Sequence, residues 1–410
     1  MKKGRDIQII TYGCKVNQYE AAVIENNLSG SSVPDGKNLV IIMSCCVTAR
    51  AEKECCQTIK RLLKQKEAPE IIVASCYVKK DRERLTREFP QVIFCSDYSQ
   101  LKNIMGIKTW QNKLDSFFEH CRAFVKVQDG CDQFCSYCLV PYVRPGNKSR
   151  PLPEIEEEVQ GLIINGYSEI VLTGIRLGKY EFSDGKVKIG LEGLLKKLLE
   201  LVEKNGWKDK VRFRLSSLEI GEVTPELIEL FRQNPFNLCG HFHLPLQSAS
   251  ERILRMMNRP YNQKFYLGVI SQIKKNLPDA AITTDIIVGF PTETEEDFQQ
   301  TREFVEEVGF SRLHIFSYSR RPGTLADRLS GHLPWPVIQQ RRKELVLVDK
   351  TLRERFVKKF IDRQLPAVLD GKKSVLTDNY IHLSLEKTSG LSRIFSVKIV
   401  SPQQAVAVTK

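Results

Sequence analysis

The sequence predicts an α/β protein of three parts: a Rossmann-like parallel sheet, a partial barrel of six strand–helix units, and a small all-β barrel. Two observations predict this order. Up to about residue 316, short apolar runs alternate with helical patterns, which is typical of parallel sheets. After residue 360, strand-like runs follow one another without helical patterns between them, which is typical of an all-β unit. We place the three domains at residues 1–118, 119–348 and 349–410.

The composition fits a globular protein with a polyanionic partner. The chain has 410 residues, of which 42% are hydrophobic, and a net charge of +13. The hydrophobic content predicts a full core, and the positive charge favours a polyanion such as nucleic acid. No apolar run approaches the roughly 18 to 20 residues that span a bilayer. We therefore expect no membrane-spanning segment.

The cysteine content indicates the compartment. The N-terminus, Met1–Asp6, runs into a strand and lacks the apolar core of a signal peptide. Twelve cysteines in such a chain favour a reducing cytoplasm, and metal or cluster chemistry rather than disulfides.

The first hundred residues contain three buried strands in succession. They are predicted at Ile7–Tyr12, Leu39–Met43 and Ile71–Ala74. Helical patterns that begin near Gln18 and Ala49 connect them. Strand–helix–strand units of this kind form a parallel sheet, in which ligands gather at the carboxyl ends of the strands.

A cysteine follows each of these three strands. Cys14, Cys45 and Cys76 are separated by two steps of 31 residues. Because the carboxyl ends of parallel strands meet at one edge, we expect the three thiols to converge there. Three thiolates would hold an iron–sulfur cluster and leave one iron open. Cys46 lies beside Cys45, and spacing alone does not separate the two.

The alternative is that these cysteines are ordinary buried residues. That interpretation serves well for four others, namely Cys55, Cys56, Cys121 and Cys239. Cys95 also follows a short apolar run, Val92–Phe94, and we interpret it as a small core side chain.

The central part predicts a partial barrel. Six strands are expected, at Ala123–Gln128, Glu169–Thr173, Arg212–Ser216, His241–Pro245, Ala281–Val288 and Arg312–Phe316. Helical patterns lie between them, among others at Pro153–Asn165, Leu191–Asn205 and Glu295–Val308. In barrels, the loops at the carboxyl ends of the strands build the site.

Three further cysteines follow the first of these strands, in the spacing Cys131-x3-Cys135-x2-Cys138. Three thiolates on one short loop fill only three corners of a cubane cluster, so that one iron stays free for another ligand. A zinc knuckle is the alternative. Zinc would need a fourth Cys or His nearby, and none follows within the next hundred residues.

Four segments together resemble the methylthiotransferases, a family of radical S-adenosylmethionine (SAM) enzymes. They are Thr11–Glu20, Ser44–Thr48, Ser75–Tyr77 and Gly130–Cys138. Further segments resemble landmarks of the same family: Ser149–Pro151, Leu172–Ile175, Arg214–Glu219, His243–Ser248, Met257–Arg259 and Thr284–Pro291. Two positions depart from the family pattern. Met43 stands where the family usually has Asn, and Thr292 stands where it more often has Gly.

The resemblance implies a chemistry and its cofactors. Such enzymes carry two 4Fe–4S clusters and use SAM to insert a methylthio group into an unactivated C–H bond. The resemblance implies that the Cys131, Cys135 and Cys138 cluster binds SAM, and it aligns Cys45, rather than Cys46, with the second ligand of the auxiliary cluster. It also implies a reducing partner of the flavodoxin type.

Polar residues on the rim of the expected barrel are our candidates for SAM contacts. Gly174 would allow close backbone approach, Ser216 and Gln247 would form hydrogen bonds, and Asp285 would bind a ribose or another polar edge. For each, the alternative is a satisfied polar group at a strand end. Four basic residues beyond strand ends could face phosphates or be ordinary surface charges: Arg144, Lys148, Arg150 and Arg176.

The tail predicts a basic β-barrel. A long helix is expected at Val337–Phe360, and five strands follow it, at Leu365–Leu369, Val375–Thr377, Tyr380–Leu385, Ile394–Ile399 and Ala405–Thr409. Residues 351–410 carry 11 Lys and Arg against 5 Asp and Glu. The segment Leu376–Tyr380 resembles the TRAM module, a small β-barrel associated with RNA binding. Such a barrel would bind phosphates without reading sequence; the alternative is a capping domain with a charged surface.

The family offers two classes of substrate, a tRNA adenosine beside the anticodon and an aspartate of a ribosomal protein. Gly13–Glu20 and Leu172–Ile175 most resemble the enzymes that act on N6-threonylcarbamoyladenosine in tRNA. We therefore predict a tRNA methylthiotransferase that modifies C2 of this base. N6-isopentenyladenosine and the aspartate stay as alternatives. So does a different class, a non-catalytic RNA-binding protein with structural zinc. The oligomeric state is left open.

Overall fold

The computed structural model describes residues 6–29, 38–107, 109–114, 116–117, 122–185, 187–386 and 393–408. The chain forms two compact units. The first comprises Met1–Phe118, Gly130–Gln133 and Cys138–Gly146, and the second comprises Glu119–Asp129, Phe134–Tyr137 and Asn147–Lys410. The stretch from 130 to 146 thus contributes to both units. The domain boundaries at residues 118 and 348 stay a prediction.

The first unit is built on a parallel sheet, as expected. Its strands are β1 (Ile7–Thr11), β2 (Leu39–Ser44), β3 (Glu70–Ser75) and β4 (Ile93–Cys95), in the order β1-β2-β3-β4. Ile7 pairs with Leu39, which pairs with Glu70, so the first residues of β1, β2 and β3 are in register. Every residue of β2 is buried, as both faces of a parallel sheet are covered. The fourth strand was not predicted.

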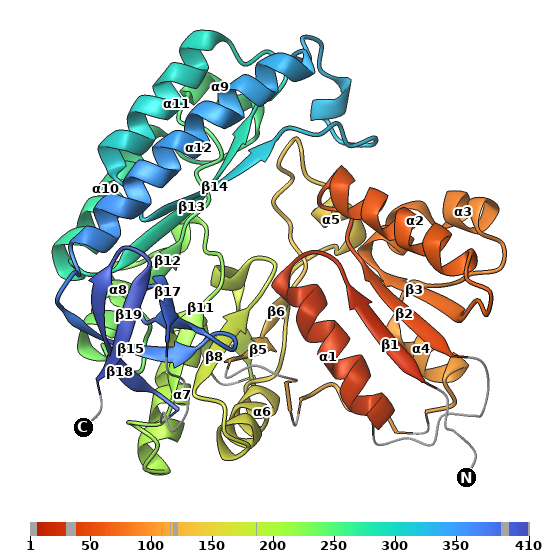
Figure 1. Cartoon of the computed structure of the whole chain (residues 1–410), viewed down its shortest axis with the longest axis horizontal. Helices are drawn as coiled ribbons and strands as arrows, with labels where there is room; N and C mark the ends of the chain where they lie inside the picture. The colour runs from red at the N-terminus through yellow and green to blue at the C-terminus, as the bar shows by residue number, and fades with distance from the viewer. Residues whose placement is uncertain are drawn as a thin grey trace. The chain divides into compact units, whose positions relative to one another are not determined.

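Helices cover both faces of this sheet (Figure 1). They are α1 (Lys15–Ser29), α2 (Ala49–Leu63), α3 (Cys76–Glu88) and α4 (Tyr98–Ile104). Apolar residues of α2 and α3 pack with Val40, Ile42 and Val73 on one face. Those of α1 and α4 pack with Ile41 and Ile72 on the other. This two-sided core is the Rossmann-like arrangement that the sequence predicted.

The second unit contains six parallel strands in sequence order. One sheet has the order β11-β8-β5, and the other has β12-β13-β14. The strands are β5 (Arg122–Lys126), β8 (Glu169–Thr173), β11 (Arg212–Leu215), β12 (His241–His243), β13 (Ala281–Val288) and β14 (Arg312–Ser317). Isolated bridges from Phe213 to Leu238 and from Ser217 to His243 join the two sheets. The predicted partial barrel of six strands is confirmed.

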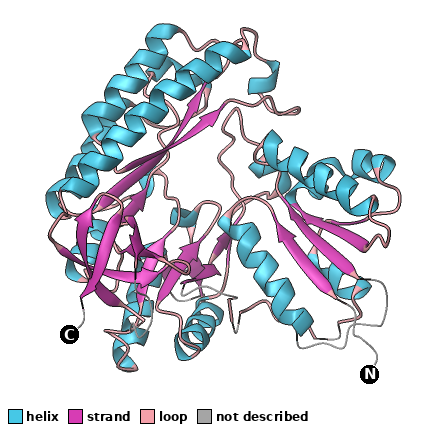
Figure 2. Cartoon of the chain, in the orientation of Figure 1, coloured by secondary structure: helices cyan, strands magenta, loops and turns pink. Residues whose placement is uncertain are grey.

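The helices of the second unit lie on the outer side of these strands (Figure 2). They are α6 (Leu152–Ile164), α7 (Leu191–Lys204), α8 (Pro225–Gln233), α9 (Glu251–Met256), α10 (Gln263–Asn276), α11 (Glu295–Val308) and α12 (Trp335–Lys358). The sequence of α7 explains why this helix buries one face. Its buried residues recur at helical spacing, at Leu191, Leu194, Leu195, Leu198 and Val202. Helix α11 begins with a capping box between Thr294 and Asp297 and ends at the left-handed Gly309.

Shorter elements complete the two units. The first unit also holds the one-turn helix α5 (Val140–Val143). The second holds β6 (Gln128–Asp129), β7 (Lys148–Ser149), β9 (Phe182–Ser183), β10 (Lys188–Ile189), and the 3-10 turns η1 (Leu177–Lys179), η2 (Ile220–Glu222) and η3 (Ala326–Arg328). Strand β6 pairs with β7, and β9 pairs with β10, in antiparallel fashion.

The tail of the second unit is a closed barrel, as predicted. Its strands are β15 (Gln364–Leu369), β16 (Ser374–Thr377), β17 (His382–Leu385), β18 (Phe395–Ser401) and β19 (Gln404–Val408), in the order β15-β16-β17-β19-β18. Alternate residues such as Val375, Leu383 and Val397 fill its interior, together with Phe356 of α12 and Phe360, which follows that helix. Closure leaves no free sheet edge.

A buried ion cluster lies at the amino ends of the partial-barrel strands. Glu169 is fully buried, and its carboxylate accepts hydrogen bonds from Arg122, Arg212 and Arg214, each at 2.8 Å. Although burial alone would raise the pKa of Glu169, the three guanidinium groups hold it well below its usual range.

Two of these arginines also hold the small barrel in place. Arg212 donates to the carbonyl of Leu376 and Arg214 to that of Thr377, both at 3.0 Å. The ring of Tyr380 stacks on His241 with the centroids 4.0 Å apart. The small barrel is therefore docked at the amino ends of the strands, away from the edge where barrel sites form.

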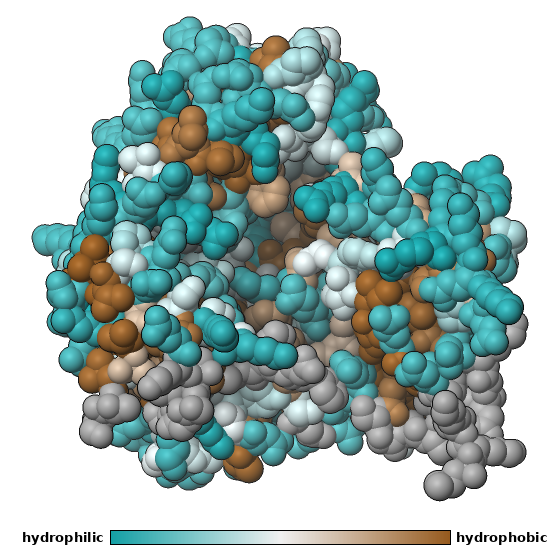
Figure 3. Space-filling view, in the orientation of Figure 1, coloured by the Kyte–Doolittle hydropathy of each residue, from teal (hydrophilic) through white to brown (hydrophobic). Residues whose placement is uncertain are grey.

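The surface shows mainly hydrophilic side chains over the outer helices of the second unit, with few hydrophobic ones among them (Figure 3). The exposed hydrophobic residues of α12 include Val346 and Leu347. Within the described ranges, no helix combines the length and the apolar character that crossing a membrane requires.

Candidate functional site

Side-chain hydrogen bonds tie the carboxyl ends of β1, β2 and β3 together in the first unit. The amide of Asn17 donates to the carbonyls of Tyr12 and Ser44, both at 3.0 Å. The hydroxyl of Ser44 donates to the carbonyl of Ala74 at 2.6 Å, and that of Ser75 donates to Asn17 Oδ1 at 3.0 Å. The edge that carries the three expected cysteines is therefore held in a fixed arrangement.

Gly13 lets the first of these loops approach the second. Its φ is +104°, a conformation that favours glycine. A Cβ placed on Gly13 would lie 2.4 Å from the Cβ of Cys45 and 2.6 Å from its Sγ. The turn before Cys14 therefore packs directly on Cys45, and no larger residue fits there.

The thiols at this edge lie close enough to affect one another's ionisation. Burial, together with the neighbouring Cys14 and Cys76, raises the pKa of Cys45 to about 12. Burial, aided by Cys76, also raises the pKa of Cys14. The structure thus brings the three sequence-predicted cysteines together.

Cys46 is a fourth thiol at this edge, which spacing could not place. A hydrogen bond between Cys46 and Cys76 raises the pKa of Cys46 and lowers that of Cys76. Cys46 is fully buried and belongs to the core between the sheet and α2, whereas Cys95 belongs to the opposite core with Leu101.

The charged partner of this edge is Arg144, which follows α5. Its guanidinium Nε donates to Cys76 Sγ at 3.0 Å, and its two Nη atoms donate to Glu20 at 2.9 and 2.7 Å. Arg144 and Glu20 are 6% and 4% exposed. Arg144 is thus an internal charge, and the expectation that it faces a phosphate was wrong. Arg150 and Arg176 also have internal partners, Glu158 and Glu222.

The loop of Cys131, Cys135 and Cys138 is shaped by Gly130. The φ of Gly130 is +79°, and a Cβ there would lie 2.0 Å from the carbonyl oxygen of Gly146. The amide of Cys131 donates to the carbonyl of Arg144 at 3.1 Å. Only glycine at position 130 allows the backbone to approach that of Gly146 so closely.

Each sulfur of this loop accepts a hydrogen bond. The amide of Gln133 donates to Cys131 Sγ at 3.3 Å, and the amide of Val140 donates to Cys138 Sγ at 3.4 Å. In the second unit, Arg259 Nη1 donates to Cys135 Sγ at 3.3 Å. Hydrogen bonds of this kind orient the sulfur ligands of a cluster.

Arg259 is held as Arg144 is, by a carboxylate and further polar atoms. It is 7% exposed and forms an ion pair with Glu219. Its Nε donates to Tyr261 Oη at 3.0 Å. Arg259 lies in one of the segments that resemble the family, Met257–Arg259, but its role was not predicted.

The four candidates for SAM contacts form two neighbouring pairs in the second unit. The amide of Gly174 donates to the hydroxyl of Ser216 at 3.4 Å, and the amide of Gln247 donates to the carbonyl of Asp285 at 2.8 Å. Asp285 lies within β13 rather than after it, and its carboxylate is 3.2 Å from Nε2 of His243. Their contacts with SAM stay a prediction.

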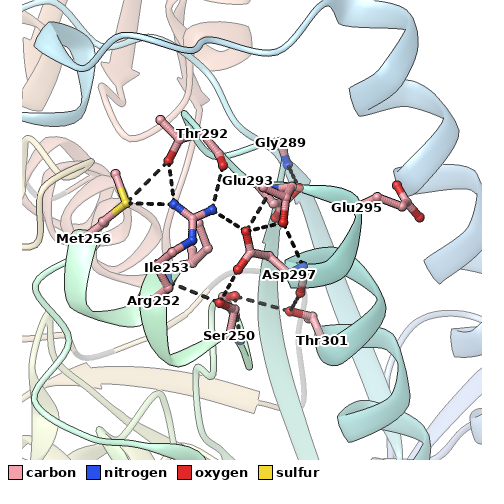
Figure 4. A network of polar contacts seen from close by, with 12 residues as sticks. Ser250, Arg252, Ile253, Met256, Gly289, Thr292, Glu293, Glu295, Asp297 and Thr301 are labelled. Carbon is pink, nitrogen blue, oxygen red and sulfur yellow. Dashed lines mark hydrogen bonds and ion pairs between the residues drawn. The ribbon is translucent and has the colours of Figure 1, made fainter.

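A polar network supports the turn that follows β13 (Figure 4). Thr292 has a φ of +68°, although its branched side chain disfavours this conformation. Arg252 donates to the carbonyl of Thr292 at 2.7 Å and pairs with Asp297, whose carboxylate accepts from Ser250 at 2.5 Å. These contacts hold the residue that replaces the glycine usual in the family.

The donor set suits iron–sulfur clusters. All eleven cysteines in the described part of the chain are free thiols. Within the same residues, no three His, Cys, Asp or Glu side chains gather as ligands of a single metal ion. A cubane spreads its thiolates over separate irons, so its ligands need not converge on one point.

Two family models match the chain. Residues 125–305 match the Radical SAM superfamily, and residues 6–96 match an Uncharacterized protein family, UPF0004. The first match contains Cys131, Cys135 and Cys138, and the second contains Cys14, Cys45 and Cys76.

Named relatives cover nearly the whole chain. A threonylcarbamoyladenosine tRNA methylthiotransferase MtaB of Thermotoga maritima is 34% identical over 88% of this chain and 85% of its own length. One of the same name from Bacillus subtilis is 31% identical over 95% and 92%. A tRNA-2-methylthio-N(6)-dimethylallyladenosine synthase of Clostridium tetani is 34% identical over 89% and 85%.

Solved structures share the fold at low sequence identity. The radical SAM methyltransferase TsrM of Kitasatospora setae, with tryptophan and a SAM analogue bound, aligns with a TM-score of 0.56. The alignment covers 79% of this chain and 75% of TsrM at 10% identity. At this identity the likeness supports the architecture alone.

Proposed function

The chain belongs to the methylthiotransferase family of radical SAM enzymes, and we propose that it transfers a methylthio group to C2 of N6-threonylcarbamoyladenosine in tRNA. The observation that carries the substrate is the name shared by relatives that match most of the chain, from Thermotoga maritima to Bacillus subtilis. The chain is a transferase with two 4Fe–4S clusters that uses SAM.

In this proposal Cys131, Cys135 and Cys138 hold the cluster that binds SAM, and Cys14, Cys45 and Cys76 hold the auxiliary cluster. When bound, the first supplies the electron that splits SAM into methionine and a carbon radical. A radical is needed because the hydrogen on C2 of adenine is too weakly acidic for a general base to remove.

The protein's own groups would prepare these sites. Gly13 and Gly130 allow loop approaches that a Cβ would block. Gln133, Val140 and Arg259 donate hydrogen bonds to the three sulfurs of the SAM-binding loop. Gly174, Ser216, Gln247 and Asp285 stay our candidates for holding SAM itself. Ser216 and Asp285 each accept a backbone hydrogen bond from another candidate, which supports a preformed rim.

The C-terminal barrel supports tRNA as the partner. Residues 351–410, which comprise the end of α12 and the barrel, carry 11 Lys and Arg against 5 Asp and Glu. This excess suits phosphates, whose contacts add affinity without sequence information. A reducing protein of the flavodoxin type would supply electrons in the cytoplasm.

N6-dimethylallyladenosine is the second candidate, because relatives such as the one from Clostridium tetani carry that name at similar identity. Nucleoside mass spectrometry of tRNA from a deletion strain separates the two. We expect 2-methylthio-N6-threonylcarbamoyladenosine to disappear and to return with the wild-type chain but not with Cys131→Ala. Loss of the dimethylallyl product instead would overturn the substrate assignment.

A further inference from the structure

Arg144 contacts both the SAM-binding loop and one of the auxiliary cysteines. Its backbone carbonyl accepts a hydrogen bond from the amide of Cys131 at 3.1 Å. Its guanidinium donates to Cys76 Sγ at 3.0 Å. One residue therefore contacts a cysteine of each proposed set, and all of these atoms belong to the first compact unit.

The guanidinium of Arg144 is fully engaged inside the protein. It donates to both oxygens of Glu20 at 2.9 and 2.7 Å, to Asn17 Oδ1 at 3.2 Å and to Ser75 Oγ at 3.3 Å. This bidentate pairing fixes the orientation of the Arg144 guanidinium. Because burying a charge pair costs desolvation energy and is weak evidence for a stabilising role, the contact with Cys76 is the more informative feature.

A cationic donor at a cluster sulfur acts on the reduction potential of that cluster. Reduction adds one electron, and the added negative charge is shared by the sulfur ligands. A positive N–H donor stabilises the reduced state, whereas a nearby carboxylate destabilises it. At low exposure both effects are strong, because water does not screen them.

We propose that Arg144 is a positioning residue that holds Cys76 and stabilises the reduced state of the auxiliary cluster. Glu20 orients the guanidinium and limits its effect. This inference rests on the proposed function, since it requires that cluster to be present.

A second arginine is arranged in the same way and gives a matched control. Arg259 donates to Cys135 Sγ at 3.3 Å and pairs with Glu219 in the second unit. A variant at Arg259 is therefore expected to alter the potential of the SAM-binding cluster, and one at Arg144 that of the auxiliary cluster.

The test is a redox titration of anaerobically reconstituted protein with dithionite, followed by electron paramagnetic resonance. Cys131→Ala isolates the auxiliary cluster in the Arg144 and Glu20 samples, and Cys14→Ala isolates the SAM-binding cluster in the Arg259→Gln sample. In Arg144→Gln we expect the equilibrium between oxidised and reduced cluster to shift at least tenfold toward the oxidised form, or about 59 mV for one electron. Arg144→Lys should recover part of the shift, and Glu20→Gln should shift the equilibrium in the opposite direction.

Further variants distinguish a change in the reduction potential of the auxiliary cluster from a failure of the protein to fold. Arg341→Gln removes another buried arginine, which pairs with Glu293 at 2.6 Å within the second unit, and should leave the potential unchanged. If Arg144→Gln fails to fold, the shifts in Arg144→Lys and Glu20→Gln decide. A folded Arg144→Gln protein with a full auxiliary cluster and an unchanged potential overturns the inference. Absence of the auxiliary cluster from the parent protein would instead overturn the proposed function.

Discussion

Replacement of Gly13 by alanine should destroy the auxiliary site while leaving the fold in place. The φ of +104° at this position is one that side-chain-bearing residues rarely adopt, and the new Cβ would lie 2.4 Å from the Cβ of Cys45. The backbone strain costs about 1–3 kcal/mol, and relief of the overlap costs about 1–3 kcal/mol more. The sum, about 2–6 kcal/mol, lies mostly below the roughly 5–15 kcal/mol by which domains are stable, so we expect a local rearrangement rather than loss of the fold.

The protein can lower this cost by moving Cys45 away from Cys14. We therefore expect Gly13→Ala to lose about half of the iron after anaerobic reconstitution, together with a lower melting temperature. Gly106→Ala is the matched control in the same unit. Gly106 also has a positive φ, of +64°, but a Cβ there meets nothing within 4 Å, so only about 1 kcal/mol of strain is expected. A Gly13→Ala protein with full iron content and the stability of Gly106→Ala would refute the reasoning.

Three further predictions follow from single residues. Glu169→Gln leaves three buried arginines without their carboxylate and should destabilise the protein by about 3–5 kcal/mol in urea unfolding. Because the pKa of Glu169 is lowered in the folded state, its contribution is full above the ordinary value of 4.5 and lost as the pH falls below it; equal acid sensitivity of wild type and variant would contradict this. Thr292→Gly should raise stability by about 1 kcal/mol by relieving the positive φ, and a lower melting temperature would show that its contacts with Arg252 matter more. Cys45→Ala should lose the auxiliary cluster and keep reductive SAM cleavage, whereas Cys46→Ala should keep both; the reverse outcome would make Cys46 the ligand.

The strands were predictable because the spacing of their apolar residues in the sequence indicates that they are buried. In the central part, Glu169–Thr173 and Ala281–Val288 were predicted with the bounds of β8 and β13. The strand β4 was missed because it has only three residues, Ile93–Cys95, which is too short for a periodic signal. The small barrel was predictable from the change of period after α12.

The candidate sites were predictable where the cysteines are close in sequence or where strand topology brings them to one edge. The three cysteines after β1, β2 and β3 could be placed at one edge by topology alone. The pairing of Arg144 with Glu20 spans 124 residues, and no local pattern reveals it. From sequence alone, an arginine in a loop is interpreted as a surface charge, because its burial is not visible there. Spacing left the choice between Cys45 and Cys46 open, because adjacent residues share a strand end, and only the resemblance to the family favoured Cys45.

The most direct test of the account is a turnover experiment with two purified tRNAs. Anaerobically reconstituted protein, with SAM and dithionite, receives tRNA that carries either N6-threonylcarbamoyladenosine or N6-dimethylallyladenosine, and the digested nucleosides are measured by mass spectrometry. A pocket shaped for the polar threonylcarbamoyl group presents partners that a prenyl group cannot satisfy. We predict that only the first tRNA gains a methylthio group, and that Cys14→Ala and Cys131→Ala each abolish the product. Equal modification of both tRNAs, or of neither by protein with two intact clusters, would contradict it.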